Sequence, residues 1–446
     1  YIGGCVMKKL MLICAPVSSR SGYGDHARDL VYSFCKSGKF DIKILDVRWG
    51  ECPRNALDPL DEKHRIIIEC LLPSMQLDRQ PDVFQPVGKF NIGITAGIET
   101  NAVSQAWLDG CNKMDLIIVP SEHSKGGFVK TAYDKINNLP DGQQQTVGQL
   151  KLEKPMEVVF EGSDEDIYKP LTVDEIDIDF FDMLNEKVTE KFAFLSVGQW
   201  GKGNYGEDRK DIGKMIKIFY ESFANKQKKP GLLLKTNGAT YSIMDKSECI
   251  KKINDIKSMF PKDWDLPNVY LLHGDLNKEE MNKLYNHPKV KSMVSFTHGE
   301  GFGRPLLEST MVGLPVIASN WSGQCDFLDT KNSLLLSGKL VQVPKSAVWK
   351  DIIIDESQWF SIDESDAYKS LNYSFQEYDD VNNKAKHLMK QNVEKFSLNK
   401  MTEKLNEILE KYVDSSPTQV DLNLPKLKKV SKSEPPKIKL PKLKRV

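Results

Sequence analysis

The 446-residue chain lacks the marks of several protein classes. No apolar run approaches the ~20 residues that cross a bilayer, so a spanning helix is not indicated. The eight cysteines form no C-x-x-C pair and have no regular spacing, which argues against a disulfide framework or a zinc site. No cluster of His, Cys and carboxylate residues has metal-ligand spacing. We therefore expect a cytoplasmic protein without a resident metal.

The chain also lacks a net charge, because 62 Lys and Arg residues balance 62 Asp and Glu residues. The charges are unevenly placed, since residues 424–446 carry nine Lys and Arg residues and one acid, Glu434. Proline and lysine dominate this end, and we expect residues 415–446 to form a disordered basic tail. Such a tail could contact nucleic acid, or it could hold the protein peripherally on an anionic membrane surface, or it could simply be solvated.

Short apolar runs alternate with helical stretches, a pattern that predicts an α/β protein with parallel sheets and crossover helices. The first set of expected strands is Leu10–Cys14, Ile42–Val47, Arg65–Glu69, Phe90–Thr95 and Leu116–Pro120. The second set is Met156–Phe160, Ala193–Val197, Leu232–Thr236, Val269–His273, Ser292–Ser295, Val316–Ser319 and Ser333–Leu336. Two sets of strands and the chain length favour two domains.

Residues 162–190 are acidic and lack a strong strand pattern, so the domain boundary should fall near residues 161–190. We expect a first domain over residues 1–160 and a second over residues 161–380. Residues 134–153 are polar and rich in Gly and Gln, which predicts a loop. Helical spacing then continues through residues 381–414.

The motif richest in chemistry is a glycine-rich loop between a strand and a helix. It places Gly301, Phe302 and Gly303 at the N-terminus of the helix. Free N–H groups and the positive end of the helix dipole make this an anion site, suited to a diphosphate. Glycine also lets a ligand approach the backbone closely.

Two carboxylates flank this loop. Glu300 precedes the glycines, and Glu308 lies about one turn into the helix. Each can accept hydrogen bonds from hydroxyl groups, and a molecule with hydroxyls on both sides of a diphosphate is a nucleotide sugar. The alternative is an ordinary strand–helix junction with two surface glutamates.

The run Glu300-Gly-Phe-Gly-Arg-Pro-Leu-Leu-Glu308, followed by Gly313-Leu-Pro-Val-Ile-Ala, resembles the signature of the retaining GT-B glycosyltransferases of group 1, or family 4. Arg304 stands where that family usually has an apolar residue. The resemblance implies a GT-B architecture of two Rossmann-like domains facing a central cleft. It also implies that the helix over 381–414 crosses back to the first domain.

The same resemblance implies an enzymatic role for the loop. Glu300 would contact the donor sugar, the amides of Gly301 to Gly303 would hold the phosphate, and Glu308 would bind the nucleotide ribose. The reaction would transfer a hexosyl or pentosyl group from a UDP- or GDP-sugar to an acceptor hydroxyl with retention of configuration. Neither a metal nor a permanently bound cofactor would be required.

Basic residues follow another expected strand. Gly198 ends the strand, and Arg209 and Lys210 precede a helical pattern, where their charges could stabilise a leaving diphosphate. Many relatives carry an Arg directly after the loop glycine, where this chain has Gln199. Arg209, Lys210 and Lys202 therefore remain alternatives for the phosphate contact, and a solvated charge cluster is the other interpretation.

Two weaker matches lie further along the chain. His273 follows a strand that resembles the border of the nucleobase site, although a simple turn would explain it equally well. Asp326 replaces the more usual Glu in a loop that resembles one near the donor.

The first domain offers candidates for the acceptor side. Gly22 and Gly24 open a helix after the first strand and could cap the phosphates. His26 or Glu99 could activate the acceptor hydroxyl, and a structural role is an equal alternative for each. The acceptor could be a glycan, a lipid-linked molecule or a nucleic acid.

Other functions fit less well. A nicotinamide-dependent oxidoreductase needs a third loop glycine, where this chain has Ala27. A catalytically inactive GT-B binding module, tethered to nucleic acid or membrane by its tail, is opposed by the presence of Glu300 and Glu308. An enzyme that glycosylates modified DNA bases is compatible with the sequence but is not selected by it.

Overall fold

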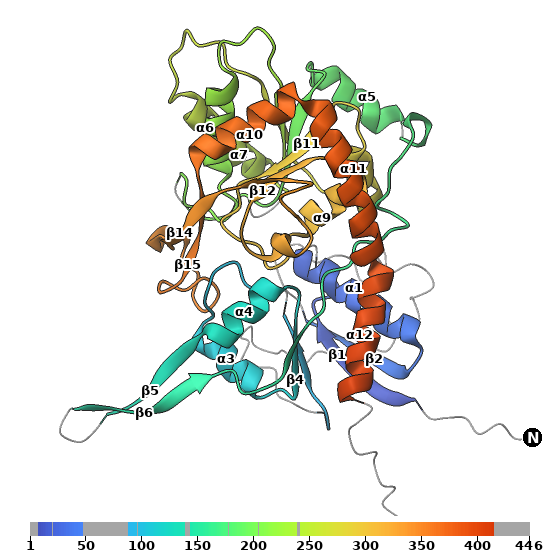
Figure 1. Ribbon diagram of the computed structural model, residues 1–446, viewed down its shortest axis with the longest axis vertical. Helices are drawn as coiled ribbons and strands as arrows, with labels where there is room; N and C mark the ends of the chain where they lie inside the picture. Colours follow the sequence, from blue (N-terminus) through green and yellow to red (C-terminus); the bar gives the residue numbers. More distant parts are fainter. Residues whose placement is uncertain are drawn as a thin grey trace, which may run out of the picture.

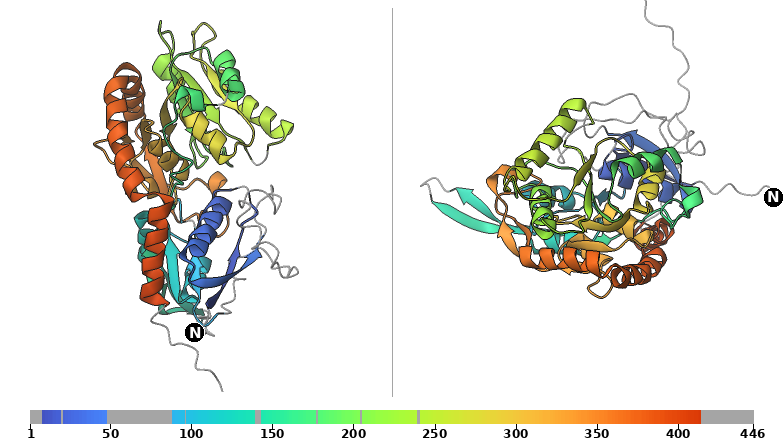
Figure 2. Two further views of the ribbon diagram at one scale, coloured as in Figure 1. Left: turned by 90° about the vertical axis from the view of Figure 1, so that its right-hand side faces the viewer. Right: turned by 90° about the horizontal axis from the view of Figure 1, so that it is seen from above.

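Two α/β domains are stacked along the long axis of the protein, and two C-terminal helices run beside both of them (Figures 1 and 2). These helices are α11 (Tyr378–Lys395) and α12 (Leu398–Tyr412). Within the part that can be described, no helix is long and apolar enough to cross a membrane. The computed structural model describes residues 8–19, 21–47, 88–95, 97–138, 143–176, 178–203, 205–238 and 241–413.

The second domain contains a six-stranded parallel sheet in the order β10-β9-β8-β11-β12-β13. Its strands are β8 (Ala193–Val197), β9 (Gly231–Lys235), β10 (Val269–Leu272), β11 (Val290–Ser295), β12 (Val316–Ser319) and β13 (Leu334–Leu336). Counted along the chain, this order is 3-2-1-4-5-6, the order of a Rossmann sheet. The strands predicted for this sheet are confirmed within two residues at each end.

The first domain is built on a parallel sheet in the order β3-β4-β7, with β1 and β2 paired in parallel beside it. Its strands are β1 (Lys9–Ala15), β2 (Phe40–Asp46), β3 (Ile92–Ile94), β4 (Leu116–Val119) and β7 (Met156–Val158). The assignment of Met156–Phe160 to the second set was wrong, because β7 pairs with β4. The expected strand Arg65–Glu69 lies outside the described residues.

Where the structure describes residues 134–153, the predicted loop is wrong. Residues 134–138 and 144–151 belong to an antiparallel hairpin of β5 (Ala132–Asn138) and β6 (Gln144–Lys151), which projects from the body of the first domain in Figure 1. Backbone hydrogen bonds hold such a ribbon whatever its outward side chains are, so a polar sequence concealed it. Its base is anchored by buried Leu150 and by Tyr133, whose hydroxyl donates to the Val103 carbonyl over 2.5 Å.

The helical stretch predicted over 381–414 is interrupted at Phe396 and Ser397. Ser397 caps α12 by accepting from the Lys400 amide. At the break, Ser163 donates to the Phe396 carbonyl and accepts from the Leu398 amide, at 3.0 and 2.7 Å. Ser163 lies in the segment that connects the two domains, so this segment is hydrogen-bonded to the break between α11 and α12. The exact domain boundaries stay a prediction.

The C-terminal helices pack on different domains. Helix α11 packs against α9 (Arg304–Met311) of the second domain. Helix α12 packs against α1 (Gly22–Ser37) of the first domain, where the hydroxyls of Ser33 and Thr402 are 2.8 Å apart. Among the described residues, the other α-helices are α3 (Gln105–Asn112), α4 (Glu122–Lys130), α5 (Ile178–Lys187), α6 (Ile212–Phe223), α7 (Ile243–Lys257), α8 (Lys278–Tyr285) and α10 (Glu364–Gln376). The strands β14 (Gly338–Gln342) and β15 (Gln358–Ile362) pair with each other.

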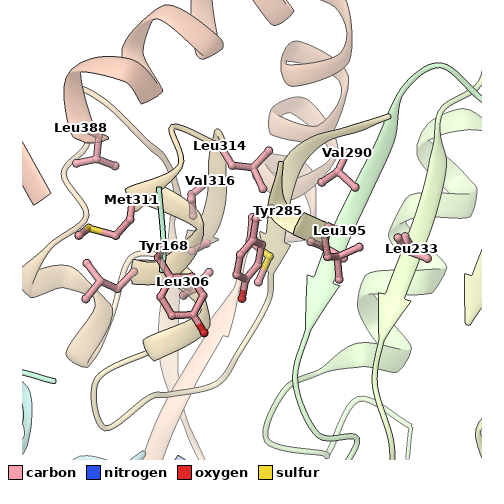
Figure 3. Packing of buried hydrophobic residues seen from close by; sticks show 14 of the residues in the cluster. Tyr168, Leu195, Leu233, Tyr285, Val290, Leu306, Met311, Leu314, Val316 and Leu388 are labelled. Atoms are coloured by element: carbon pink, nitrogen blue, oxygen red, sulfur yellow. The ribbon is translucent and has the colours of Figure 1, made fainter. Parts of the chain in front are cut away.

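A large apolar cluster lies on one face of the second sheet and supports α9 (Figure 3). It joins Leu195 and Leu233 of the sheet to Leu306 of α9 and Leu388 of α11. Burying one aliphatic side chain contributes about 1.5–3 kcal/mol, so this cluster holds the N-terminus of α9 firmly against the sheet. The loop before α9 is thereby positioned.

Candidate active site

The Rossmann order of the second sheet fixes where a ligand can bind. The strand order reverses between the parallel central strands β8 and β11, and open α/β sheets bind ligands at the carboxyl ends of the strands at such a switch point. Gly198 follows β8, and the glycine-rich loop follows β11. Two of the predicted segments therefore meet at the position expected of a ligand site.

The loop enters α9 through a residue with a left-handed backbone. Gly303 is the N-cap of α9 with φ of 100°, a conformation that favours glycine, and it offers no side chain to cap the first amides. Pro305 lies in the first turn, where its missing N–H costs nothing. A Cβ on Gly323 would lie 2.2 Å from the Gly301 carbonyl oxygen, so the neighbouring loop also approaches closely. This geometry leaves helix amides available for an anion.

Glu300, Arg209 and Lys210 converge beside the loop. Arg209 Nη1 lies 3.2 Å from Glu300 Oε2, and Lys210 Nζ contacts Glu300 Oε1. Burial alone would raise the pKa of Glu300, but the two cations outweigh it and hold that pKa below its usual value. Burial lowers the pKa of Lys210, whereas Glu99 and Glu300 hold that of Arg209 above its usual value. The site thus concentrates two cations around one ionised carboxylate.

The backbone near Arg209 is fixed to the same loop. Its carbonyl accepts a hydrogen bond from the His298 amide over 2.8 Å. A Cβ on Gly198 would lie 3.2 Å from Lys210 Cε, so Gly198 leaves room for that side chain. Gln199 instead donates to the Gly238 carbonyl over 2.6 Å, and Lys202 makes no ion pair within the described ranges. Of the sequence candidates for the phosphate contact, the structure brings Arg209 and Lys210 to the site.

Glu308 is buried one turn into α9. Its Oε1 accepts from Arg304 Nε over 3.0 Å, and its Oε2 accepts from the Tyr285 hydroxyl over 3.2 Å. Burial raises the pKa of Glu308, and Arg304 opposes this effect. Figure 3 shows Tyr285 among the residues of the apolar cluster. These two contacts fix the Glu308 side chain. Glu308 follows the glycine-rich loop in the sequence, whereas Glu300 precedes it.

The first domain contributes several groups to the same place. Glu99 follows β3, and its Oε1 lies 3.7 Å from Arg209 Nε. The Ser121 hydroxyl, at the N-terminus of α4, donates to the Gly301 carbonyl over 2.6 Å. Asp326 accepts from the Glu122 amide over 2.9 Å. Glu99 and Asp326 were predicted, and both contact the opposite domain.

The predicted acceptor-side residues lie at the start of α1. Ser21 caps the helix by accepting from the Gly24 amide, and a Cβ on Gly24 would lie 2.0 Å from the Ser19 carbonyl oxygen. Gly22 begins the helix and has open space around it. His26 is 5% exposed, and burial lowers its pKa to about 4, so its imidazole is neutral at pH 7. A neutral imidazole can accept a proton, but this one is covered.

His273 lies apart from the loop, at the carboxyl end of β10. Its Nε2 is 2.7 Å from Asp245 Oδ2, and the Tyr241 ring lies 6.2 Å away between ring centroids. Within the described part of the chain, no group of His, Cys, Asp and Glu is arranged to hold a metal ion.

Sequence reasoning missed three residues that join the two domains: Asp29, Asn101 and Ser121. Asp29 contacts Arg304 and Lys278, and Asn101 contacts Gln358. A signal existed for Ser121, because it follows a predicted buried strand directly, at the sheet edge where ligands bind. No local pattern marks Asp29 or Asn101.

Comparisons with known proteins agree with this geometry. Residues 262–355, which include the loop and α9, match the family model of glycosyl transferases group 1. No curated protein matches the chain. Similar solved structures include a glycosyltransferase from Rickettsia africae, with a TM-score of 0.59, 13% identity, and coverage of 92% of this chain and 100% of that one.

Two further solved structures contain ligands. Anabaena HepE in complex with UDP and glucose has a TM-score of 0.57 and 12% identity, covering 91% of this chain and 100% of that one. The UDP-forming α,α-trehalose-phosphate synthase of Burkholderia xenovorans, in complex with glucose-6-phosphate, has a TM-score of 0.51 and 10% identity, covering 88% and 79%. The predicted architecture is thus confirmed: the chain has the GT-B fold and carries a glycosyl transferases group 1 region around its glycine-rich loop.

Proposed function

We propose that the protein is a glycosyltransferase that moves a sugar from a nucleotide-diphosphate donor to an acceptor hydroxyl. The observation that carries the proposal is the convergence of Arg209 and Lys210 on Glu300 beside the N-terminus of α9. Two cations and a helix end form an anion site at the switch point of a Rossmann sheet, and a carboxylate stands beside it for sugar hydroxyls.

The reaction breaks the bond between the anomeric carbon and the diphosphate oxygen. Negative charge grows on the leaving diphosphate, where Arg209, Lys210 and the amides of Gly301 to Gly303 stabilise it without a metal. An incoming diphosphate competes with Glu300 for the two cations. Glu300 is then released to accept hydrogen bonds from the donor sugar, while Glu308 accepts those of the ribose. The acceptor hydroxyl attacks the anomeric carbon from the face that the diphosphate leaves, so the anomeric configuration is retained.

The donor and the acceptor follow less directly. HepE in complex with UDP and glucose supports a UDP-sugar, with a GDP-sugar as the alternative. Glu99 lies beside Arg209, so it is the better placed of the two predicted bases. His26 is covered and would need a rearrangement to reach an acceptor. The acceptor is a glycan, lipid-linked molecule or nucleic acid.

The test is thermal unfolding against UDP, GDP, ADP, CDP and NAD, with Glu308→Ala as the comparison variant. A ligand at 100 times its dissociation constant adds about 2.7 kcal/mol to the free energy of unfolding, which a shift in Tm reveals. We expect one nucleoside diphosphate to stabilise the wild type and to stabilise Glu308→Ala much less.

Other outcomes separate the alternatives. Stabilisation by NAD alone would contradict the transferase and favour an oxidoreductase. Stabilisation by none of the five, with no hydrolysis of UDP- or GDP-sugars, would favour an inactive binding module. Activity that EDTA abolishes and a divalent metal restores would overturn the metal-independent mechanism.

A further inference from the structure

A buried arginine links the candidate donor site to the other domain. Arg304 Nε donates to Glu308 Oε1 over 3.0 Å, and Arg304 Nη1 lies 2.6 Å from Asp29 Oδ2 on α1. Lys278 Nζ, on α8, lies 3.3 Å from Asp29 Oδ1. The side chains of Arg304, Asp29 and Glu308 are each less than a tenth exposed.

This arrangement depends on both domains. Burial alone would raise the pKa of Asp29, but Arg304 and Lys278 outweigh it and hold that pKa below its usual value. A buried guanidinium is strongly destabilising unless it is paired. Asp29 comes from the first domain, whereas Arg304, Glu308 and Lys278 belong to the second. The charge that Arg304 carries is therefore compensated across the seam between the domains.

The direction of the guanidinium decides how much of Glu308 is left for a ligand. An arginine normally pairs with a carboxylate through two parallel hydrogen bonds, which occupy both oxygens. Here Nε serves Glu308 and Nη1 faces Asp29, so Glu308 Oε2 accepts from the Tyr285 hydroxyl instead. Without Asp29, the guanidinium could turn and take both oxygens of Glu308.

We infer that Asp29 is a positioning residue of the donor site, because it draws Arg304 away from Glu308 and leaves that carboxylate able to accept hydroxyl groups of the nucleotide. The inference rests on the proposed function, in which Glu308 binds the donor. Asp29 touches no ligand and acts only through Arg304. The contact between Asp29 and Arg304 forms only when the two domains are together, so it couples nucleotide affinity to their association.

A double-mutant cycle tests this coupling. The dissociation constants of UDP and GDP are measured by calorimetry for the wild type, Asp29→Asn, Arg304→Leu and the double variant. Asp29→Asn should weaken nucleotide binding about tenfold, within the range typical of coupled residues. In the Arg304→Leu background the same change should matter less than about twofold, because no guanidinium remains to be redirected.

Two further variants make the result specific. Lys39→Ala breaks an exposed ion pair with Glu410 that also joins the first domain to α12, and it should leave nucleotide affinity unchanged. Arg304→Leu places an apolar residue in the buried site, so the double variant folds without either buried charge and keeps the cycle informative.

The inference and the proposed function can fail separately. If the wild type binds UDP or GDP and Glu308→Ala does not, but Asp29→Asn changes affinity equally in both backgrounds or not at all, the inference alone is overturned. If Asp29→Asn lowers Tm by the same amount in both backgrounds without changing affinity, its role is structural. If the wild type binds neither nucleotide, both fail.

Discussion

At the scale of single residues, Ser121 is used twice. Its hydroxyl accepts from the Ser124 amide as the N-cap of α4 and donates to the Gly301 carbonyl of the other domain. Ser121→Ala should weaken nucleotide binding about fivefold, because a lost hydrogen bond of about 1 kcal/mol leaves the loop less ordered. Titration calorimetry with the stabilising nucleotide measures the effect.

The loss of a cap must be separated from the loss of the loop contact. Asp363→Ala removes the N-cap of α10, away from the loop, and should cost a similar ~1 kcal/mol of stability without changing nucleotide affinity. Ser121→Thr keeps both roles of the hydroxyl and should bind like the wild type. Equal affinity of Ser121→Ala and the wild type would show that this contact does not order the loop.

Glu161 should make the free energy of unfolding depend on pH. Burial raises its pKa to about 8 from an ordinary value of 4.5, so it is protonated when folded and ionised when unfolded between these values. The unfolded state then binds fewer protons, and the free energy of unfolding falls as pH rises, by at most about 1.4 kcal/mol per pH unit. Urea unfolding from pH 5 to 8 should show a slope of this sign, and Glu161→Gln should reduce it. Asp208 and Asp211, whose pKa burial also raises to about 6, contribute to the part that remains.

A second carboxylate gives the opposite sign. Burial would raise the pKa of Glu157, but Lys411 and Tyr412 outweigh it and lower that pKa. Its stabilisation is present above pH 4.5 and is lost as pH falls, so Glu157→Gln should leave the slope between pH 5 and 8 unchanged. A slope in Glu161→Gln that is as steep as that of the wild type would contradict the assignment.

The residues that sequence reasoning placed together share one feature. Glu300, Glu308, Arg209 and Lys210 follow strands that meet at one sheet edge, and topology alone brings such residues close. Their roles remain proposals. Asp29 acts through contacts across the domain seam, and nothing in its local sequence distinguishes it from a solvated acid on α1.

At the scale of elements, strands of the second sheet could be predicted because buried parallel strands read as continuous apolar runs. The hairpin β5–β6 could not, since most of its residues are polar and its apolar Ile136 and Val147 are themselves exposed. The break between α11 and α12 was also missed. Apolar spacing continues through it, and the interruption comes from Ser163, far away in sequence.

The backbone at Gly162 packs closely against the break between α11 and α12, and a substitution can test this packing. A Cβ on Gly162 would lie 2.7 Å from Leu398 Cα and 2.9 Å from the Ser397 carbonyl oxygen. Because these are backbone atoms, Gly162→Ala should lower the free energy of unfolding by about 1–3 kcal/mol. Gly110→Ala is the matched control, since α3 has open space there and alanine should add up to about 1 kcal/mol. Equal Tm values for the two variants would contradict the close packing.

At the scale of the whole molecule, several of the contacts described between the domains join polar groups. They include Arg209 with Glu99, the Ser121 hydroxyl with the Gly301 carbonyl, and Arg304 with Asp29. Interfaces of this kind resemble transient ones, so relative motion of the domains is expected. Because the loop, Arg209 and Arg304 are each contacted from the first domain, the state of the seam should govern the donor site.

Asn101 offers a way to loosen the seam without touching the site. Its Oδ1 accepts from the Gln358 amide over 2.8 Å, and its own amide donates to the Gln358 carbonyl over 3.0 Å. Asn101→Ala loses the first bond, worth about 1 kcal/mol, and a longer one of 3.4 Å from Asn101 Nδ2 to Gln358 Oε1, which favours separated domains. Small-angle scattering should give this variant a larger radius of gyration than the wild type without nucleotide, and the radius should fall when UDP or GDP binds. In steady-state kinetics its KM for the donor should rise about fivefold while kcat changes little.

Asn112→Ala is the control, because it removes a contact within the first domain to the Lys151 carbonyl and should change neither the radius of gyration nor KM. An unchanged radius and KM in Asn101→Ala would mean that this pair does not hold the domains together, and a fall in kcat alone would place the effect in the chemical step rather than in closure.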